Sequence, residues 1–179
     1  TVTGPVFIDG GGLGNSVLLV DNADGAIDYA PNSQYNQAGL KNITLKANRA
    51  NAGTAFSYHG VVTGAANNPQ FTVENVLIRG DGGANYFSRG LYIDNLWYAT
   101  FKRLSLISGA TFYTNAVEIG NNVFAASFDN VAVTGAENCF NVTGAHVEGI
   151  EIINSPAACL VAKFFVTGNT SIGSPHFLI

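Results

Sequence analysis

Charged side chains are scarce in this chain: 8 Lys or Arg and 12 Asp or Glu occur among 179 residues. The charged fraction of 11% is less than half of the ~25% that is usual in globular domains. A surface helix covers its solvent face with charged and polar side chains, so little exposed helix is expected here. The 21 glycines and 20 asparagines instead favour many tight turns.

The weak charge and the short apolar runs argue against two classes of partner. The formal net charge is −4 and no basic patch occurs, so a nucleic-acid backbone is not an expected partner. No apolar run reaches the ~20 residues that a helix needs to span a bilayer, so we expect no membrane insertion.

The chain also has few residues of the kinds that hold metals or form catalytic triads. Cys139 and Cys159 are too few for a disulfide framework or a zinc site. No cluster of three or more Asp or Glu indicates calcium. The three histidines, His59, His146 and His176, have no Ser, Asp or Cys partner at the spacing of a triad. We therefore expect neither a metal nor another cofactor.

A short pattern recurs five times along the chain, and each copy reads apolar, charged, Asn-like, apolar, any residue, apolar. The copies are 40–45, 73–78, 101–106, 128–133 and 147–152. Their first residues lie 33, 28, 27 and 19 positions apart. A strand that recurs at roughly 20–50 residues is typical of repeat architectures, in which each repeat stacks on its neighbour.

Two further strand patterns accompany the first. Alternating residues of period two are found at 55–58, 90–93, 116–119, 139–142 and 159–162. A third pattern aligns 97–101 with 124–128. Three short strands per repeat, stacked in register, predict an all-β, single-stranded parallel β-helix of about six coils. We expect one domain over 1–179, with irregular opening coils over 1–37 and regular coils over 38–179.

Stacking places equivalent residues in columns about 4.8 Å apart. The column of Asn42, Asn75 and Asn130 should fall at a bend, because Asn tolerates a left-handed backbone. Arg103 and Gly149 interrupt this column. A charged column at the preceding position mostly alternates in sign, and its members are Lys41, Glu74, Lys102, Asp129 and Glu148.

The two cysteines fall in a predicted column of small residues. Cys139 and Cys159 align with Ala55, Gly90 and Ala116. Stacked neighbours would have Cα atoms about 5 Å apart, close enough to bridge in principle. We interpret both cysteines as buried free thiols that fill this column. The next column, expected to point inward, holds Leu91, Val117, Phe140 and Leu160.

The coils resemble the right-handed parallel β-helix of the pectate-lyase-like superfamily, and most of all its bacteriophage tailspike and polysaccharide-depolymerase branch. The strands at 42–45, 75–78 and 130–133, the Gly-Leu-Tyr-Ile-Asp segment at 90–94 and the opening Ile-Asp-Gly-Gly-Gly at 8–12 carry the resemblance. It covers about 38–179 well and the opening weakly. These motifs specify the fold and map no catalytic residue.

The resemblance implies a homotrimeric spike on a virion tail that binds, and often cleaves, a bacterial surface polysaccharide such as capsule or O-antigen. The chain lacks an initiator Met and 175–179 read as the middle of a strand, so we expect a fragment of a longer protein. One alternative is a non-enzymatic β-helical adhesin or structural shaft. A second alternative is a secreted polysaccharide lyase, although a glycoside hydrolase is favoured.

Glycoside hydrolysis uses two carboxyl groups, about 5–5.5 Å apart for retention and 6.5–9.5 Å for inversion. Asp94 follows the inward Ile93, and Glu118 lies between two inward residues one coil later. Their backbones should be about 8 Å apart, one rung across and two residues along. We hypothesise that Asp94 and Glu118 act as acid and as base or nucleophile. The alternative is a solvated acidic face.

Glycan binding needs exposed rings and polar hydrogen-bonding groups along an elongated face. Tyr92 shares the outward column of Glu118, where a ring beside two acids would suit the apolar face of a sugar. The full set of candidates is Tyr86, Tyr92, Tyr98, Tyr113, Arg79, Arg89 and Asn95. For each of them the alternative is ordinary surface or inter-subunit packing.

Overall fold

The computed structural model describes residues 7–31, 38–60, 71–81, 84–108, 113–168 and 177–179, and the structural statements below refer to these segments. Their regular structure is entirely β. The strands are β1 (Phe7–Asp9), β2 (Val17–Val20), β3 (Ile27–Tyr29), β4 (Ala38–Ala47), β5 (Thr54–His59), β6 (Phe71–Gly80), β7 (Arg89–Asp94), β8 (Leu96–Trp97), β9 (Ala99–Ile107), β10 (Tyr113–Ile119), β11 (Val123–Phe124), β12 (Ser127–Val142), β13 (Val147–Glu148), β14 (Ile150–Ile153), β15 (Ala157–Val166) and β16 (Phe177–Leu178). None of the described segments forms a helix long and apolar enough to cross a membrane.

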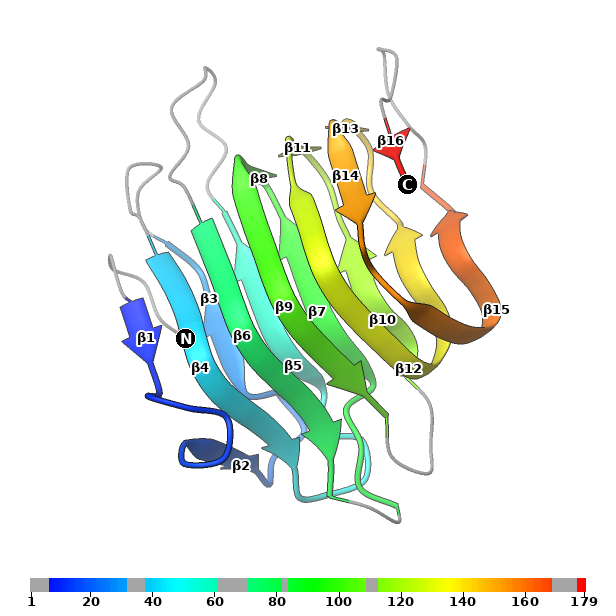
Figure 1. Ribbon diagram of the computed structural model, residues 1–179. Helices are drawn as coiled ribbons and strands as arrows, with labels where there is room; N and C mark the ends of the chain where they lie inside the picture. Colours follow the sequence, from blue (N-terminus) through cyan, green and yellow to red (C-terminus); the bar gives the residue numbers. More distant parts are fainter. Residues whose placement is uncertain (1–6, 32–37, 61–70, 82–83, 109–112, 169–176) are drawn as a thin grey trace.

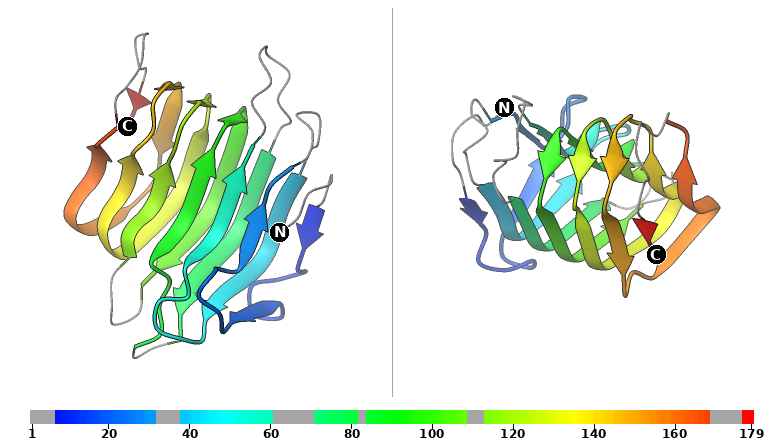
Figure 2. Two further views of the ribbon diagram at one scale, coloured as in Figure 1. Left: turned by 180° about the vertical axis from the view of Figure 1, so that it is seen from behind. Right: turned by 90° about the horizontal axis from the view of Figure 1, so that it is seen from above.

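The strands coil into a solenoid of about five turns, which confirms the predicted right-handed parallel β-helix with one turn fewer than expected. One face stacks β1, β4, β6, β9 and β12, and the opposite face stacks β3, β5, β7, β10 and β12 (Figure 1). The short strands β8, β11 and β13 form a third, narrow face along one edge (Figure 2). The pairings between these strands are all parallel, as expected when each turn repeats the path of the one before.

The long strands bend where the sequence predicts the asparagine column. Asn42, Asn75 and Asn130 have φ values of 53°, 54° and 56°, and Arg103 has 52°. Asn75 Nδ2 donates a hydrogen bond of 2.7 Å to Asn42 Oδ1, so the amides stabilise one another along the column. The left-handed backbone disfavours most side chains, and Asn is tolerated because its short polar group bonds locally.

The interior is a continuous apolar column. Phe101 and Phe128 stack with ring centroids 4.7 Å apart and an interplanar angle of 8°. Leu91, Val117 and Phe140 are buried on successive rungs, as predicted. Each turn therefore buries the apolar residues of its strands against the equivalent residues of its neighbours.

Two predictions about the last coil are wrong because its register differs from that of the motif alignment. Phe128 pairs with Ile152, which places Asn154, not Gly149, at the level of Asn130. Asn154 has the left-handed φ of 49° and donates to Asp129 Oδ1 at 3.3 Å. The true spacing from Asn130 to Asn154 is therefore close to that of the preceding turns.

The register also corrects the inward stack. Phe140 pairs with Phe164, and Leu160 is 63% exposed instead of buried. An irregularity in the pairing of β12 with β15 lies on both sides of Ala136. Such bulges shift one strand by a residue and re-aim the side chains that follow, and apolar alternation alone does not reveal them.

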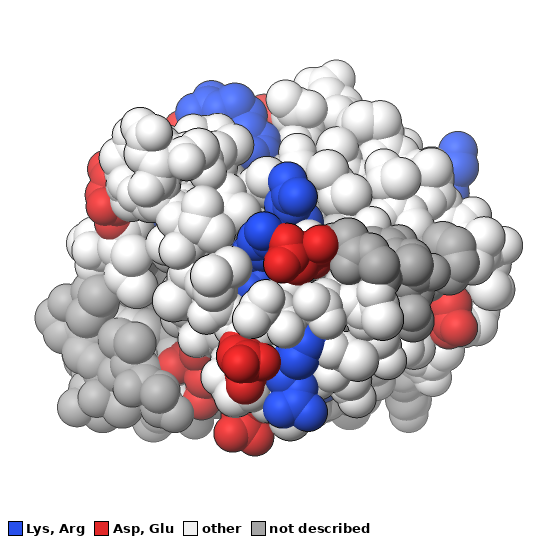
Figure 3. Space-filling view, turned by 90° about the horizontal axis from the view of Figure 1, so that it is seen from below, with Lys and Arg blue, Asp and Glu red and all other residues white. Residues whose placement is uncertain are grey.

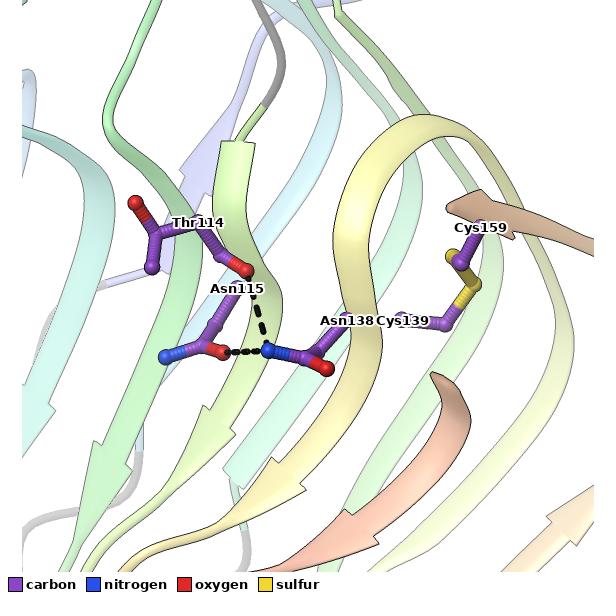
Figure 4. The surroundings of a disulfide bond; sticks show 5 residues. All are labelled: Thr114, Asn115, Asn138, Cys139 and Cys159. Atoms are coloured by element: carbon purple, nitrogen blue, oxygen red, sulfur yellow. Dashed lines mark hydrogen bonds between the residues drawn. A yellow bond between two sulfur atoms is a disulfide. The ribbon is translucent and has the colours of Figure 1, made fainter. Parts of the chain in front are cut away.

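The cysteines are joined, so the interpretation as free thiols is wrong. Cys139 on β12 and Cys159 on β15 form a disulfide with Cα atoms 5.7 Å apart (Figure 4). Cys159 pairs with Ala136 and not with Cys139, so the bond runs diagonally across the irregular rung. Beside it, Asn138 Nδ2 donates to Asn115 Oδ1 at 3.2 Å.

The scarce charges lie on the outside in small groups of mixed sign, and most of the face seen in Figure 3 is uncharged. The predicted charged column is confirmed over four rungs, since Lys41, Glu74, Lys102 and Asp129 pair in register. Its fifth member is Ile153 instead of Glu148. Lys41 Nζ lies 3.4 Å from Glu74, an exposed pair of small energetic value.

Candidate functional site

A cleft of about 740 Å³ lies on the outer side of the face formed by β3, β5, β7 and β10. One column of outward residues supplies its floor, with Asp28, Ser57, Tyr92 and Glu118 paired in register on successive strands. Each lies next to buried residues of its strand, so strand alternation turns these four outward. The remaining lining residues are Asn22, Asp24, Gly25, Ala26, Thr54, His59 and Arg89.

Glu118 is held by a set of donors. Arg89 Nη1 donates to Glu118 Oε1 at 2.9 Å, and Asn115 Nδ2 donates to Glu118 Oε2 at 2.8 Å. Thr143 Oγ1 lies 3.5 Å from the same carboxylate. Asn115 is itself buried and accepts from Asn141 Nδ2 at 3.1 Å. The carboxylate is thereby fixed in one orientation, with both oxygens engaged.

A second, smaller pocket of about 290 Å³ adjoins the cleft. Its lining is Ser88, Arg89, Thr114, Asn115 and Glu118. Because Arg89 and Glu118 line both hollows, this ion pair forms the partition between them. The cleft is lined from four successive strands of one face, so it runs along the solenoid axis.

Asp94 lies beside the cleft, next to Tyr92 on the same strand, and is not among the residues that line it. Its carboxylate accepts from the backbone N–H of Asn121 at 2.8 Å and from Asn95 Nδ2 at 3.2 Å. Burial raises the pKa of Asp94, and these hydrogen bonds together with the nearby His59 only partly offset that effect.

Gly120 makes room for this arrangement. A Cβ at Gly120 would lie 2.7 Å from the Tyr92 hydroxyl and 3.1 Å from Asp94 Oδ1. The hydroxyl and the carboxylate therefore both lie close to a residue that has no side chain. Burial is the main cause that raises the pKa of Tyr92, and the carboxylates of Asp94 and Glu118 raise it further. The structure thus brings the two predicted acids to the same tyrosine.

The opening coil and β5 contribute residues that sequence reasoning missed. Ser57 Oγ donates to Asp28 Oδ1 at 3.0 Å, and His59 Nε2 lies 3.5 Å from the same oxygen. The His59 ring packs against Tyr92 with centroids 5.1 Å apart. The pattern Ala-Ile-Asp-Tyr at 26–29 could have indicated Asp28, because it repeats the alternation of 55–58.

Tyr92 is not a free platform for sugar stacking. The Arg89 guanidinium carbon lies 4.8 Å from the centroid of the Tyr92 ring, and the His59 ring contacts it as well. A sugar face could stack on the ring only after one of these groups moved. The cleft therefore offers hydrogen-bonding side chains more than a free aromatic face.

The remaining candidates lie in different environments. Tyr113 is fully buried and donates to the carbonyls of Ile78 and Ile107 at 3.1 and 3.2 Å, so its expected surface role is wrong. Burial also raises the pKa of Tyr113. Tyr113 is an inward residue at the start of β10, so its ring points into the core. There, two backbone carbonyls accept hydrogen bonds from its hydroxyl.

Tyr86, Tyr98 and Arg79 lie away from the cleft. Tyr98 is 58% exposed and has a left-handed φ of 56° beside the narrow face. Tyr86 is partly buried, and its backbone bonds to Arg49 and Ala52. Arg79 lines a separate pocket of about 340 Å³ on the opposite side of the solenoid. The structure therefore gathers only Tyr92, Arg89 and Asn95 of the seven binding candidates around Asp94 and Glu118.

Within the described segments, no three His, Cys, Asp or Glu side chains gather closely enough to hold a metal ion. The side chains of the cleft offer carboxyl, hydroxyl, imidazole and guanidinium groups, which suit proton transfer, charge stabilisation and hydrogen bonding. A half-buried carboxyl with a raised pKa and a carboxylate with fixed donors, both near Tyr92, form an arrangement suited to acid–base work on a polar substrate.

Comparisons with known proteins give no match for this chain. No model of a protein family, no curated protein and no solved structure is significantly similar to it.

Proposed function

We propose that this chain binds a bacterial surface polysaccharide, capsule or O-antigen, in the cleft of β3, β5, β7 and β10. The observation that carries the proposal is the cleft itself, a hollow of about 740 Å³ on a rigid solenoid with polar side chains from four successive strands. An extended glycan can meet one such side chain per rung. The resemblance of the coils to phage tailspikes supports the same class of ligand.

We also propose that the protein hydrolyses this polysaccharide. Asp94 is the general acid, because burial keeps its carboxyl protonated to higher pH than usual. Glu118 is the base or nucleophile, since Arg89 and Asn115 hold its carboxylate in place. Tyr92, between the two acids, donates or accepts a hydrogen bond at the sugar.

Glycan release tests this function. The protein is incubated with purified capsules and O-polysaccharides from a bacterial panel, and the products are followed by mass spectrometry. Release of whole repeat units with saturated ends is expected. Unsaturated ends would instead indicate a lyase, and binding without release would indicate a non-enzymatic adhesin or shaft. No binding to any member would contradict the proposal.

Amide substitutions of the two carboxyl groups test their proposed catalytic roles. Glu118→Gln and Asp94→Asn should each slow release at least about 100-fold, the lower range for loss of an acid or base. Glu137→Gln is the matched control, because Glu137 is exposed on β12 and lies outside the cleft. Full activity of both cleft variants would refute the catalytic assignment while leaving glycan binding intact.

The assembly that we propose is a homotrimer on a virion tail. Exposed apolar side chains support a partner surface, since Ile107 is 44% and Val161 is 72% exposed. Sedimentation velocity at micromolar concentration tests this point. A stable monomer would count against the trimer and would favour a secreted form of the protein.

A further inference from the structure

The narrow face formed by β8, β11 and β13, along the upper edge in Figure 1, presents aromatic side chains to the outside. Its three strands are two residues long and pair in register. The first residue of each strand is buried, so strand alternation turns the second residue outward. These outward residues are Trp97, Phe124 and Glu148.

The two aromatic rings of this face are partly exposed and contact each other. Trp97 and Phe124 lie with ring centroids 4.9 Å apart and an interplanar angle of 70°. The Nε1 atom of Trp97 is buried and has no hydrogen-bond partner among the described residues. Tryptophan N–H groups usually find a partner when buried, so one donor of this face is left unsatisfied.

Tyr98 extends the aromatic surface at a strained position of the backbone. It is 58% exposed and has a left-handed φ of 56°. Ala125 and Gly149 make the same bend on the next two rungs, with φ values of 53° and 68°. A bulky side chain is uncommon in this region, and the small residues show that the bend does not need one. Residues held in such conformations cluster at functional sites.

The opposite border of the narrow face is a column of polar residues at a second left-handed bend. Asn95, Asn122 and His146 have φ values of 51°, 53° and 56°. Asn122 Nδ2 donates to Asn95 Oδ1 at 2.8 Å, and Asn95 Nδ2 donates to Asp94 Oδ2 at 3.2 Å. These amides therefore connect the narrow face with the carboxyl group beside the cleft.

The size of this surface indicates which kind of partner it fits. Two residues along each strand and three rungs at the usual spacing give a footprint of roughly 100 Å². A stable protein–protein interface needs about 800 Å² on each partner. One or two sugar rings match the smaller area. A sugar also combines a CH face, which packs on aromatic rings, with hydroxyls that bond to amides.

We propose that the narrow face is a second glycan-binding surface, on which Trp97, Phe124 and Tyr98 hold a sugar ring by its apolar CH face. The proposal rests on the proposed function for its class of ligand and adds a binding surface outside the cleft. The bend at Asn95 leads directly from Asp94 to Trp97, so one polysaccharide chain can contact the cleft and the narrow face together.

Tryptophan fluorescence tests this surface directly, because Trp97 is the single tryptophan of the chain. The intact chain is titrated with each capsule and O-polysaccharide of the panel. Quenching of Trp97 by acrylamide is followed, and calorimetry measures the overall affinity. A polysaccharide that binds should shield Trp97 from the quencher. The same quenching is measured without glycan over a range of protein concentrations.

Variants of Tyr98 link the affinity to the narrow face. Tyr98→Ala should fold, because Ala125 occupies the equivalent bend, and it should bind the polysaccharide roughly fivefold more weakly. Tyr98→Phe keeps the ring and should bind within about twofold of the native chain. Phe7→Ala is the matched control, because Phe7 is 62% exposed on β1, outside the narrow face. Thermal unfolding verifies that each variant is folded.

The outcomes separate this surface from the proposed function. Polysaccharide binding without shielding of Trp97, or with equal affinity of Tyr98→Ala and the native chain, overturns the second surface and leaves binding in the cleft. Shielding that grows with protein concentration in the absence of glycan also overturns it, because a second copy would then cover the face. Failure of every polysaccharide to bind removes the proposed function and this surface together.

Discussion

Arg89 Nη1 donates a hydrogen bond of 2.9 Å to Glu118 Oε1, which joins β7 to β10 across one rung of the solenoid. The same guanidinium lies 4.8 Å above the centroid of the Tyr92 ring. Arginine can do both at once because its planar group forks and stacks, whereas lysine carries a compact charge. The pair holds the Glu118 carboxylate at the boundary between the two hollows.

Arg89→Lys should therefore weaken glycan binding by roughly fivefold, equivalent to about 1 kcal/mol for the lost stacking on Tyr92 and the lost hydrogen bond to Glu118. The charge remains, so the solenoid should stay folded. Calorimetric titration with the glycan found in the panel measures the change. Arg49→Lys is the control, because Arg49 is exposed and does not line the cleft. Equal affinities for both variants would contradict this role of Arg89.

The raised pKa of Asp94 predicts the pH dependence of stability and activity. Its folded pKa lies above the ordinary value of 3.8, so the folded state binds the proton more tightly than the unfolded state. The contribution of Asp94 to stability should fall as pH rises from about 4 through the folded pKa. Urea unfolding between pH 4 and 7 should show a shallower decline for Asp94→Asn.

The rate of glycan release should also depend on the protonation of Asp94. A general acid must carry its proton, so glycan release should decrease as pH rises through the raised pKa of Asp94. Identical pH profiles of stability for the native chain and Asp94→Asn would show that this carboxyl is not perturbed.

Removal of the Cys139–Cys159 disulfide should destabilise the last coil. The bond closes a loop with a sequence separation of 20, for which the chain-entropy estimate is about 3 kcal/mol. Hydrogen exchange of the double Cys→Ala variant should accelerate in β15 and leave β4 and β6 protected, because turns of a solenoid contact only their neighbours. Uniform acceleration over all turns would contradict this local effect.

The asparagine column can be tested at Asn75. Asn75→Ala removes the hydrogen bond to Asn42 and places a Cβ without a polar group at φ 54°, so a loss of about 1–2 kcal/mol is expected. Asn75→Gly also removes the hydrogen bond but tolerates the backbone, so it should lose less. Urea unfolding compares the two, and equal losses would show that the left-handed backbone does not matter.

Gly120 provides a probe of the site. Gly120→Ala would place its methyl group 2.7 Å from the Tyr92 hydroxyl and 3.1 Å from Asp94 Oδ1, so both side chains must shift. We expect roughly tenfold slower glycan release, the size of effect that small misplacements of catalytic groups produce. Gly14→Ala is the matched control, because no heavy atom lies within 4 Å of its added Cβ.

The coils could be predicted because each repeat contains the same pattern of apolar, charged and Asn residues. Asn42, Asn75 and Asn130 mark the same bend, and the alignment of Phe101 with Phe128 was confirmed by their stacked rings. The last coil was not predicted correctly, because Phe128 pairs with Ile152 and not with Val147 of the fifth motif copy, and because the pairing of β12 with β15 is irregular near Ala136. The disulfide follows from that irregular rung, so the sequence indicated proximity but not the bond.

The site was predicted in part for a similar reason. Tyr92 and Glu118 share a column in regular coils, and the alternation of their strands sets the outward side. Asp28 was missed because the opening coil is too short to align by motif. Ser57 and His59 lie in β5 within the regular coils, and they were missed because their contacts are with Asp28. Tyr113 was misplaced because its exposure depends on the turns packed over it, and no local pattern records those.

The cleft takes one floor residue from each of four successive turns, Asp28, Ser57, Tyr92 and Glu118. The set of side chains that it presents is therefore modular: removing or duplicating a whole turn would preserve the backbone path while changing which side chains become neighbours. A lineage of such chains could change this surface by gaining and losing turns, without redesigning an interior. Swapping single turns between related solenoids is thus a direct route to new specificities.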